Sequence, residues 1–526
     1  MRGGLKSRSQ TLSDLSAQAS LDVLVIGAGA TGVSTALLAA QSGCQVALLE
    51  ARDFGSGTSS RSSKLLHGGV RYLAQGRIGL VRQALRERSH FVQWAPHLAQ
   101  PLSFVLPATS VWERSLHRLG LGLYQGLAGS HSLGATSTVD ADELQRRWPE
   151  LKSNHWAGGV AYWDALFEDA RMALWLASDA QAHGAHVLNH AQVTALHALG
   201  SGGFEVAWRD TLSGTTHGLR ARCVINASGV WVDHVRQLRP PTQQASRVHR
   251  DTITPSQGIH LVLRWPQGVP EHRHALLWPH TADGRVLFFI PWLGHWLVGT
   301  TDTWVPEVSE EPRALAHEIE FLCQEASKVL QTPIDQSQVC SVWAGLRPLA
   351  VDPRRAQAGA GGRVSREHAV QVDPDGLINV LGGKWTTCRV MAQDALQVAQ
   401  RVTGMRWQAP ELIAHPDGGS ASASPVSLTQ PPGLHLYGPL QDQVRATQGA
   451  DVDLGLGLSE AMVRHAVRHE QACTVQDVLA RRHRMLFLDA RLAQEVAPQV
   501  SEIMTQEGVS NPQLSAFLQT CQQYQV

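Results

Sequence analysis

The chain has 526 residues and a formal net charge of zero, because 45 Lys and Arg balance 45 Asp and Glu. This balance argues against a nucleic-acid-binding protein, whose contact face needs a basic excess. No apolar run approaches the ~18 residues of a membrane-spanning helix. The seven cysteines form no Cys-x-x-Cys pair, which argues against a disulfide framework and fits a reducing compartment. The 25 histidines lack the spacing of metal ligands, so we expect no metal site.

The first 20 residues are polar and rich in serine, and they lack the apolar centre of a signal peptide. We therefore expect a disordered tail over residues 1–20. A transit peptide is the less favoured alternative.

Residues 21–50 carry a dinucleotide-binding pattern. An apolar run typical of a buried parallel strand leads into Gly27, Gly29 and Gly32 at GxGxxG spacing, and an apolar helix, a second strand and Glu50 follow. The first glycine permits the turn, the second lets the backbone approach a pyrophosphate, and the third lets helix and strand pack closely. The helix N-terminus offers N–H groups to the phosphates, and Glu50 is placed to hold a ribose hydroxyl. The pattern predicts a dinucleotide cofactor but does not separate FAD from NAD.

Residues 51–73 are dense in glycine and short hydroxyl side chains. Such residues bring backbone donors close to a ligand, while Lys64 and Arg71 supply positive charge for an anion. Leu65 and Leu66 interleave with the polar residues, so we expect a packed ligand-binding loop rather than a solvated one.

The stretch GTSSRSSKLLHGGVRYL, residues 57–73, resembles a motif of the FAD-dependent, quinone-linked glycerol-3-phosphate dehydrogenases. Further motifs resemble that family in the same order: APHLAQPLSFVLP (95–107), YWDALFEDARM (162–172), GRVLFFIPW (284–292), LVGTTDT (297–303), GLRPL (345–349), SREH (365–368), LGGKWTT (381–387) and VRHAVRHEQACTVQDVLARR (463–482). The resemblance covers roughly residues 20–490. It implies FAD as cofactor, oxidation of sn-glycerol 3-phosphate to dihydroxyacetone phosphate, and electron transfer to a quinone.

Two helical segments follow the loop. Residues 77–98 have helical periodicity, and residues 112–128 mix Leu and Tyr with Arg and His. A core helix is the more common explanation of the second segment. An interfacial amphipathic helix is the alternative, which the membrane acceptor implied by the resemblance favours.

The middle of the chain alternates between two kinds of sheet. Residues 186–229 return to the nucleotide domain with short strands, and they end in a small-residue turn at 226–229 that we expect beside the pyrophosphate. Residues 247–303 predict antiparallel strands, including a hairpin around Leu293 and Gly294. We expect this sheet to roof the flavin ring.

A second nucleotide element comes late in the chain. Residues 375–381 predict a strand that runs into Gly382, Gly383 and Lys384, and a helix is expected from about Cys388. A helix N-terminus aimed at a flavin would stabilise negative charge on the reduced ring. This late element favours FAD over NAD.

Residues 411–433 are rich in Pro, Gly and Ser and are expected to be a linker. Residues 434–526 predict a small helical domain. Ser459 is expected to cap one helix, Thr474 and Asp477 a second, and a third from about Ala490 is expected to be interrupted by Pro498.

The predicted fold class is α/β, with a Rossmann-like FAD-binding domain, an interleaved antiparallel substrate sheet and a C-terminal helical cap domain. The first two are expected within residues 21–410, with the substrate sheet at roughly 95–180 and 245–350.

The resemblance implies a substrate site lined by Arg71, Arg347 and Lys384. We expect Arg71 and Lys384 to bind phosphate and Arg347 to lie over the flavin near the reacting carbon. His260 is the candidate proton acceptor, although its neighbour departs from the family's Ser-His pair; an arginine, or a hydroxide held by one, is the alternative. Tyr72 is expected to hydrogen-bond the substrate or to shape the pocket.

The expected cofactor contacts gather at the glycine-rich turn, the 51–73 loop and the late element. They are Gly27, Gly29, Thr31, Gly32, Glu50, Thr58, Ser59, Ser60, Lys64, His67, Val193, Ala227, Gly229, Gly383, Lys384 and Thr386.

Three other functions compete with this interpretation: a flavin oxidase or dehydrogenase of another small hydroxy or amino acid, a flavin-binding protein without turnover, and a nicotinamide dehydrogenase. The electron acceptor, quinone or oxygen, stays open, as does the oligomeric state, with a homodimer among the alternatives. The expected location is the cytoplasm, peripheral on the cytoplasmic face of the inner membrane, with no nucleic-acid partner.

Overall fold

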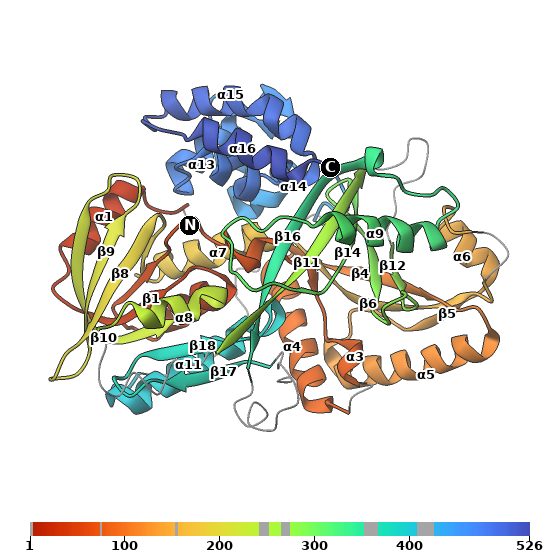
Figure 1. Cartoon of the computed structure of the whole chain (residues 1–526), viewed down its shortest axis with the longest axis horizontal. Helices are drawn as coiled ribbons and strands as arrows, with labels where there is room; N and C mark the ends of the chain where they lie inside the picture. Colours follow the sequence, from red (N-terminus) through yellow and green to blue (C-terminus); the bar gives the residue numbers. More distant parts are fainter. Residues whose placement is uncertain are drawn as a thin grey trace.

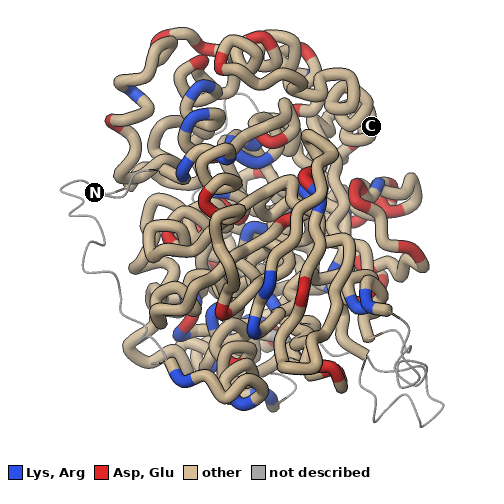
Figure 2. The backbone as a smooth tube through the Cα atoms, turned by 90° about the vertical axis from the view of Figure 1, so that its left-hand side faces the viewer, with Lys and Arg blue, Asp and Glu red and all other residues tan. Residues whose placement is uncertain are grey.

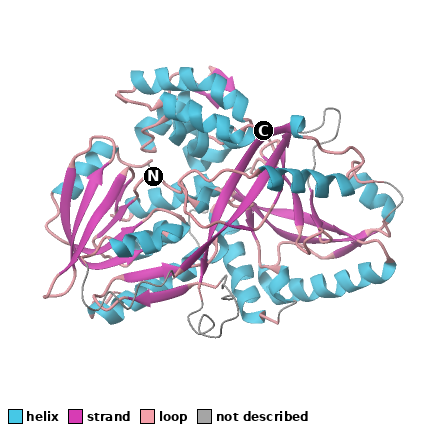
Figure 3. Ribbon diagram, in the orientation of Figure 1, coloured by secondary structure: helices cyan, strands magenta, loops and turns pink. Residues whose placement is uncertain are grey.

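The computed structural model describes residues 4–73, 76–152, 156–240, 252–264, 274–351, 367–407 and 425–526. Two large sheets lie side by side, and a helical C-terminal part lies over them (Figures 1 and 3). Acidic and basic residues are interspersed along the tube in Figure 2, in line with the zero net charge. No helix within the described ranges is long and apolar enough to cross a membrane.

The first sheet has eight strands in the order β17-β18-β10-β1-β2-β7, with β9 paired to β10 and β8 to β9. Its strands are β1 Leu21–Ile26, β2 Val46–Leu49, β7 His186–Leu188, β8 Ala191–Ala198, β9 Phe204–Asp210, β10 Thr216–Asn226, β17 Ala369–Val372 and β18 Ile378–Leu381. The central strands β18, β10, β1, β2 and β7 run parallel.

Strand β1 is buried on both faces. Val23 and Val25 face a core built from the helices α2 (Ala30–Gln41), α7 (Asp169–Ala182) and α11 (Cys388–Thr403), and Leu24 and Ile26 face β8 and β9. Burial on both faces explains the continuous apolar run at this position. The short helix α8 (Val232–Gln237) follows β10.

The second sheet has ten strands in the order β15-β11-β14-β13-β12-β4-β6-β3, with β16 paired to β11 and β5 to β6. Its strands are β3 Leu65–Leu66, β4 Ala99–Pro107, β5 Ser137–Val139, β6 Gly159–Phe167, β11 Ile253–Arg264, β12 His274–Trp278, β13 Leu287–Trp292, β14 His295–Gly299, β15 Thr303–Trp304 and β16 Val339–Ala350. The predicted hairpin is present between β13 and β14, with Leu293 and Gly294 both at positive φ.

Helices cover this second sheet on both faces. They are α3 Val70–Leu73, α4 Ile78–Trp94, α5 Val111–Ala128, α6 Ala141–Arg147 and α9 Ala316–Val329. Helix α9 closes one face, and the C-terminal helices share a core with the other. The two sheets with their helices and the C-terminal helices confirm the predicted fold class.

The C-terminal part is helical. Its elements are α12 Gln441–Arg445, β19 Asp453–Gly455, β20 Leu458–Ser459, α13 Glu460–His469, α14 Met485–Leu488, α15 Ala490–Gln506 and α16 Leu514–Tyr524. Short 3-10 or π turns across the chain are η1 Thr58–Ser60, η2 Gly129–His131, η3 Gly229–Trp231, η5 Gln336–Gln338, η6 Trp385–Thr387, η7 Leu434–Leu440 and η8 Asp477–Arg482.

The two predicted helix caps are confirmed, but the predicted interruption of the helix at Pro498 is not. The Ser459 hydroxyl accepts a hydrogen bond from the Met462 N–H at the start of α13. The Thr474 N–H donates to Asp477, and the Asp477 N–H donates to the Thr474 hydroxyl. Helix α15 runs through Pro498, so the expected break there is wrong.

The predicted disordered tail is wrong for residues 4–20. Helix α1 (Arg8–Ser16) lies against the first sheet, with Leu5 and Leu15 each 3% exposed. The Arg8 guanidinium donates to Asp210 at 2.8 Å. These few buried contacts anchor a segment whose average composition is polar. Residues 408–424 lie outside the described residues, and most of the predicted linker falls there.

Candidate dinucleotide and substrate site

The turn between β1 and α2 requires its glycines. Gly27 has a φ of 97°, and a Cβ atom on Gly32 would lie 1.7 Å from the Gly27 carbonyl oxygen. Helix α2 therefore starts tight against β1. Gly29 offers no side-chain cap, and the Ala30 N–H donates to the Ser59 hydroxyl at 2.9 Å. The other N–H groups of the first turn are the donors that suit an anion. This cradle fits the pyrophosphate of a dinucleotide.

A long cleft opens at this turn, with an empty volume of about 1350 Å³, part of it open to solvent. Eleven of the expected cofactor residues line it: Gly27, Gly29, Thr31, Glu50, Thr58, Ser59, Val193, Ala227, Gly229, Gly383 and Lys384. They come from both halves of the nucleotide sheet, which the chain brings together from positions more than 350 residues apart. The cleft fits an extended dinucleotide.

The Glu50 carboxylate is fixed on the cleft wall. It accepts hydrogen bonds from the backbone N–H groups of Ala28 at 2.7 Å and Arg52 at 3.0 Å. A carboxylate has capacity for further donors, so Glu50 retains room for a ribose hydroxyl. The Arg52 guanidinium lies 4.2 Å from the ring centroid of Trp231, another lining residue.

Among the described residues, the other five expected cofactor contacts do not line the cleft: Gly32, Ser60, Lys64, His67 and Thr386. The Lys64 side chain is fully buried, and its ammonium donates to Asp169 at 2.7 Å and to the Ser60 carbonyl at 2.8 Å. Burial lowers the pKa of Lys64 to about 7 against the opposing effect of Asp169. The Lys64 ammonium forms an interior ion pair with Asp169, and its expected contact with the cofactor stays a prediction.

Lys384 and Tyr72 come together at the edge of the cleft. The Lys384 ammonium lies 3.7 Å from the centroid of the Tyr72 ring, a cation–π contact. Gly69, at a φ of 80°, leaves room for that ring, because a Cβ there would lie 2.5 Å from it. Arg71 belongs to helix α3, but its side chain lies outside the described residues.

Arg347 lies on β16, directly before the lining residue Pro348. Its guanidinium donates to the Thr300 hydroxyl at 3.1 Å and to the Thr301 carbonyl at 3.0 Å. A Cβ on Gly258, across the strand pair, would lie 2.2 Å from one guanidinium nitrogen. The missing side chain of Gly258 therefore makes room for Arg347.

His260 lies on the neighbouring strand β11 and stacks on Trp343, with ring centroids 4.3 Å apart. Its Nε2 atom shares a hydrogen bond of 2.9 Å with the Ser63 hydroxyl. Burial lowers the pKa of His260 well below its usual value, and the charges of Lys64 and Arg347 lower it further. His260 is therefore neutral near pH 7.

Sequence reasoning missed the buried partners beneath this loop. Asp169 and Ser63 stand inside motifs quoted above, but no local spacing links them to Lys64 and His260, which lie 105 and 197 residues away along the chain. Only the fold brings these pairs together.

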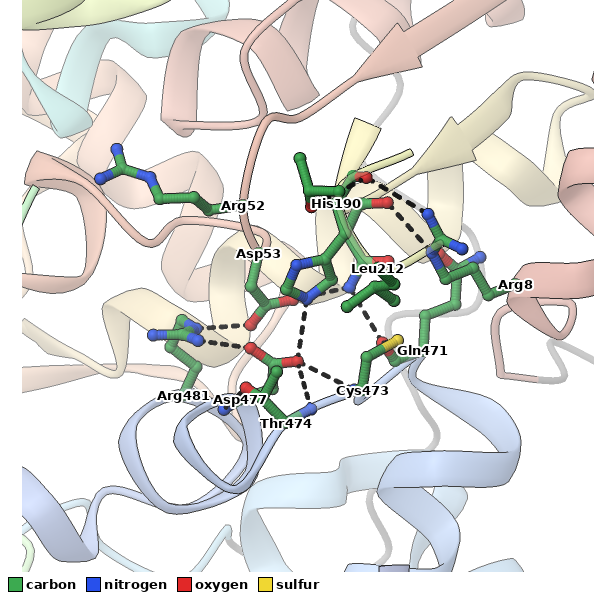
Figure 4. A network of polar contacts seen from close by, with 12 residues as sticks. Arg8, Arg52, Asp53, His190, Leu212, Gln471, Cys473, Thr474, Asp477 and Arg481 are labelled. Carbon is green, nitrogen blue, oxygen red and sulfur yellow. Dashed lines mark hydrogen bonds and ion pairs between the residues drawn. The ribbon is translucent and has the colours of Figure 1, made fainter. Parts of the chain in front are cut away.

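A polar cluster joins the nucleotide domain to the C-terminal part (Figure 4). His190, Cys473 and Asp477 place candidate metal ligands within 4.8 Å of one another. The Asp477 carboxylate, however, already accepts hydrogen bonds from His190, from the Cys473 and Thr474 N–H groups, and from Arg481. These donors satisfy its oxygens, so the cluster is an interdomain hydrogen-bond network.

Comparison with known families matches two regions of the chain. Residues 22–395 match the family described as FAD dependent oxidoreductase, and residues 434–510 match the C-terminal domain of alpha-glycerophosphate oxidase.

Several curated proteins are similar over nearly the whole chain. The probable mitochondrial glycerol-3-phosphate dehydrogenase of Caenorhabditis elegans is 35% identical over 96% of this chain and 73% of its own length. The human mitochondrial glycerol-3-phosphate dehydrogenase is 34% identical over 95% and 72%. The glycerol-3-phosphate dehydrogenase of Mycobacterium leprae is 37% identical over 92% and 85%.

A solved structure agrees over the same span. The glycerol-3-phosphate dehydrogenase of Bacillus halodurans, complexed with FAD, superposes with a TM-score of 0.77 at 25% identity, covering 99% of this chain and 98% of that one.

Proposed function

Since the chain belongs to the FAD-dependent glycerol-3-phosphate dehydrogenase family, we propose that it oxidises sn-glycerol 3-phosphate to dihydroxyacetone phosphate. The observation that carries this proposal is that one cation lines the cofactor cleft and a second directly precedes a lining residue. Lys384 lies on the cleft wall and over Tyr72, and Arg347 adjoins the wall through Pro348. A phosphate-bearing substrate needs fixed cations of this kind.

The oxidation removes a hydride and a proton from the secondary alcohol. FAD, when bound, takes the hydride at its N5 atom. Lys384 contributes a point charge for the substrate phosphate, and Arg347, held by Thr300 and Thr301, orients the carbon that reacts. Tyr72 shapes the pocket beside Lys384.

His260 receives the hydroxyl proton. Its buried imidazole is neutral near pH 7 because its pKa is lowered by burial, by Lys64 and by Arg347, and a neutral imidazole has a lone pair that accepts a proton. The Ser63 hydroxyl and the Trp343 ring hold the imidazole in place.

The electron acceptor is a membrane quinone, and helix α5 supports this part of the proposal. One apolar stripe of α5 is exposed, with Trp112 79% and Leu119 72% accessible, beside the exposed Arg118. Only Leu121, Tyr124 and Ala128 of α5 are buried. The core-helix explanation is therefore wrong for the stripe, whose apolar side chains and flanking cation suit a lipid interface.

The first experiment is anaerobic. Addition of sn-glycerol 3-phosphate to the purified yellow protein should bleach the flavin band, while glycerol without phosphate should not, because Lys384 would lack its anion. Lys384→Met should raise the substrate concentration needed for half-maximal reduction by about tenfold, the loss of one charge-assisted hydrogen bond. Bleaching by a hydroxy or amino acid instead would refute the substrate assignment.

Membrane attachment is tested by sedimentation with anionic phospholipid vesicles. Trp112→Asp combined with Leu119→Asp should abolish co-sedimentation and leave flavin reduction intact. Val452→Asp, an equally polar change at an exposed residue of the C-terminal part, is the control. Unchanged vesicle binding by the double variant would exclude α5 as the membrane face.

A further inference from the structure

Helix α16, at the C-terminal end of the helical part, reaches the cofactor loop through one tyrosine. The Tyr524 side chain is 2% exposed. Its hydroxyl donates to Glu311 at 2.6 Å and accepts from the Arg61 guanidinium at 2.7 Å. Arg61 and Glu311 also form an ion pair at 2.7 Å. The three side chains, of which Arg61 and Tyr524 are buried and Glu311 is 21% exposed, form a closed triangle drawn from three distant parts of the chain.

Arg61 links Tyr524 to the loop that lines the cleft. Its guanidinium also donates to the Ala344 carbonyl at 3.3 Å on β16, and the Nε atom donates to the Ser56 carbonyl at 3.4 Å. Ser56 and the two residues Thr58 and Ser59 line the cofactor cleft. The hydrogen bond from Arg61 to the Ser56 carbonyl therefore helps to fix the backbone of this loop.

Arg484, from the C-terminal part, contacts the same loop. Arg484 is 1% exposed and donates to the Ser60 carbonyl at 2.6 Å. Its guanidinium also lies near Glu168 at 3.2 Å, and it stacks over Phe487 at 3.8 Å. Phe487 in turn meets the Tyr524 ring edge-on, with centroids 5.4 Å apart.

We propose that Tyr524 is a positioning residue of the cofactor site, which couples docking of the C-terminal helices to the loop at residues 56–60. The loop faces the cofactor on one side and the C-terminal helices on the other, so FAD binding and the docking of α16 stabilise each other. Such coupling is reciprocal. Removing the hydrogen bonds of the Tyr524 hydroxyl weakens FAD binding, and FAD binding slows the detachment of α16 from the loop.

The test uses the full-length apoprotein with Tyr524→Phe, which keeps the ring and removes two hydrogen bonds. We expect the dissociation constant of FAD to rise about tenfold, because hydrogen bonds to charged partners are the stronger ones, and the visible circular dichroism of the bound flavin to change. Hydrogen exchange of the α16 amides should slow on addition of FAD in the wild type and slow less in the variant.

Gln525→Ala is the matched control, because Gln525 hydrogen-bonds Gln494 within the C-terminal part. It should bind FAD as the wild type does. Glu311→Gln, which keeps the shape of the second partner, should weaken FAD binding in the same direction as Tyr524→Phe. The proposal would be overturned by an unchanged FAD dissociation constant in Tyr524→Phe, or by a hydrogen-exchange rate of the α16 amides that does not change when FAD is added. Failure of the wild-type apoprotein to bind FAD would refute the cofactor site itself, so the two failures are distinguishable.

Discussion

Replacement of Gly258 by alanine tests the position of Arg347 without removing its charge. Gly258 lies in β11, opposite Gly345 of β16, in a backbone conformation that alanine also adopts. The added Cβ would lie 2.2 Å from a terminal nitrogen of Arg347, 2.7 Å from its Cζ atom and 2.6 Å from the Thr300 hydroxyl. Ordinary contacts of this kind begin near ~3.5 Å, so the guanidinium must move.

The size of the effect follows from that displacement. Arg347 must shift by about 1 Å or more, and a misplacement of ~1 Å in a positioning group costs about 100-fold in rate. The terminal nitrogen also gives up its bonds to Thr300 and Thr301, each contributing about 1 kcal/mol. We expect kcat/KM for sn-glycerol 3-phosphate to fall about 100-fold, with a loss of about 1–3 kcal/mol in the free energy of unfolding from overpacking.

The assay is the rate of anaerobic flavin reduction in a stopped-flow instrument, together with urea unfolding. Gly218→Ala is the control, because a Cβ at this position near the start of β10 would meet nothing within 4 Å; it should keep the wild-type rate. A Gly258→Ala variant that binds FAD and reduces it at the wild-type rate would refute the role assigned to Arg347.

Three further predictions concern buried groups. Burial lowers the pKa of His483 to about 4. Below pH 6.5 the unfolded chain therefore takes up a proton that the folded chain does not, and the free energy of unfolding decreases as the pH falls towards 4. Between pH 7 and pH 5, His483→Gln should lose about 2 kcal/mol less than the wild type in urea unfolding, and an identical loss would contradict this. Arg171→Met removes the nearest ion-pair partner of the buried Glu470 carboxylate, at 2.7 Å, and leaves it only Arg482 at 4.0 Å and His465 at 3.9 Å, so it should cost about 3–5 kcal/mol. Arg445→Met, at an exposed pair, should cost under about 1 kcal/mol; equal losses would be inconsistent with these environments. Ser63→Ala should lower kcat about tenfold with KM little changed, because His260 loses the bond that holds its ring; a wild-type kcat would exclude that support.

Local chemistry explains why the cofactor site was predictable. The turn at Gly27 and Gly32 is governed by sterics within one strand–turn–helix unit, so the spacing of the glycines carries the information. The capping at Ser459 is equally local. Roles assigned by resemblance to Arg347 and His260 stay predictions, although the structure places the two residues on adjacent strands.

Non-local pairing explains what the sequence did not reveal. Lys64 looked like a ligand for an anion because its neighbours are small and polar, but its partner Asp169 comes from a helix far along the chain. The polar tail near Arg8 is ordered by Asp210, 202 residues away. Periodicity predicted helix α5, yet it could not say which of its faces the rest of the protein leaves uncovered. The composition and hydrophobic periodicity of a segment predict its own secondary structure, but they do not determine which distant segments pack against it.

The ladder between β11 and β16 has a consequence for how this protein tolerates change. Its register is unbroken from the Ile253–Ala350 pair to the Val262–Ser341 pair, and the irregularity comes only after that point. Ser256 pairs with Arg347 and His260 with Trp343 inside this stretch, so the spacing of the two functional side chains is set by hydrogen-bonded strands. The segment that joins the two strands carries β14 and β15, which pair with β11, and Thr300 and Thr301, which hold Arg347. Changes of length are therefore tolerated only in the parts of that segment that neither pair with β11 nor contact Arg347, while the chemistry is inherited with the ladder.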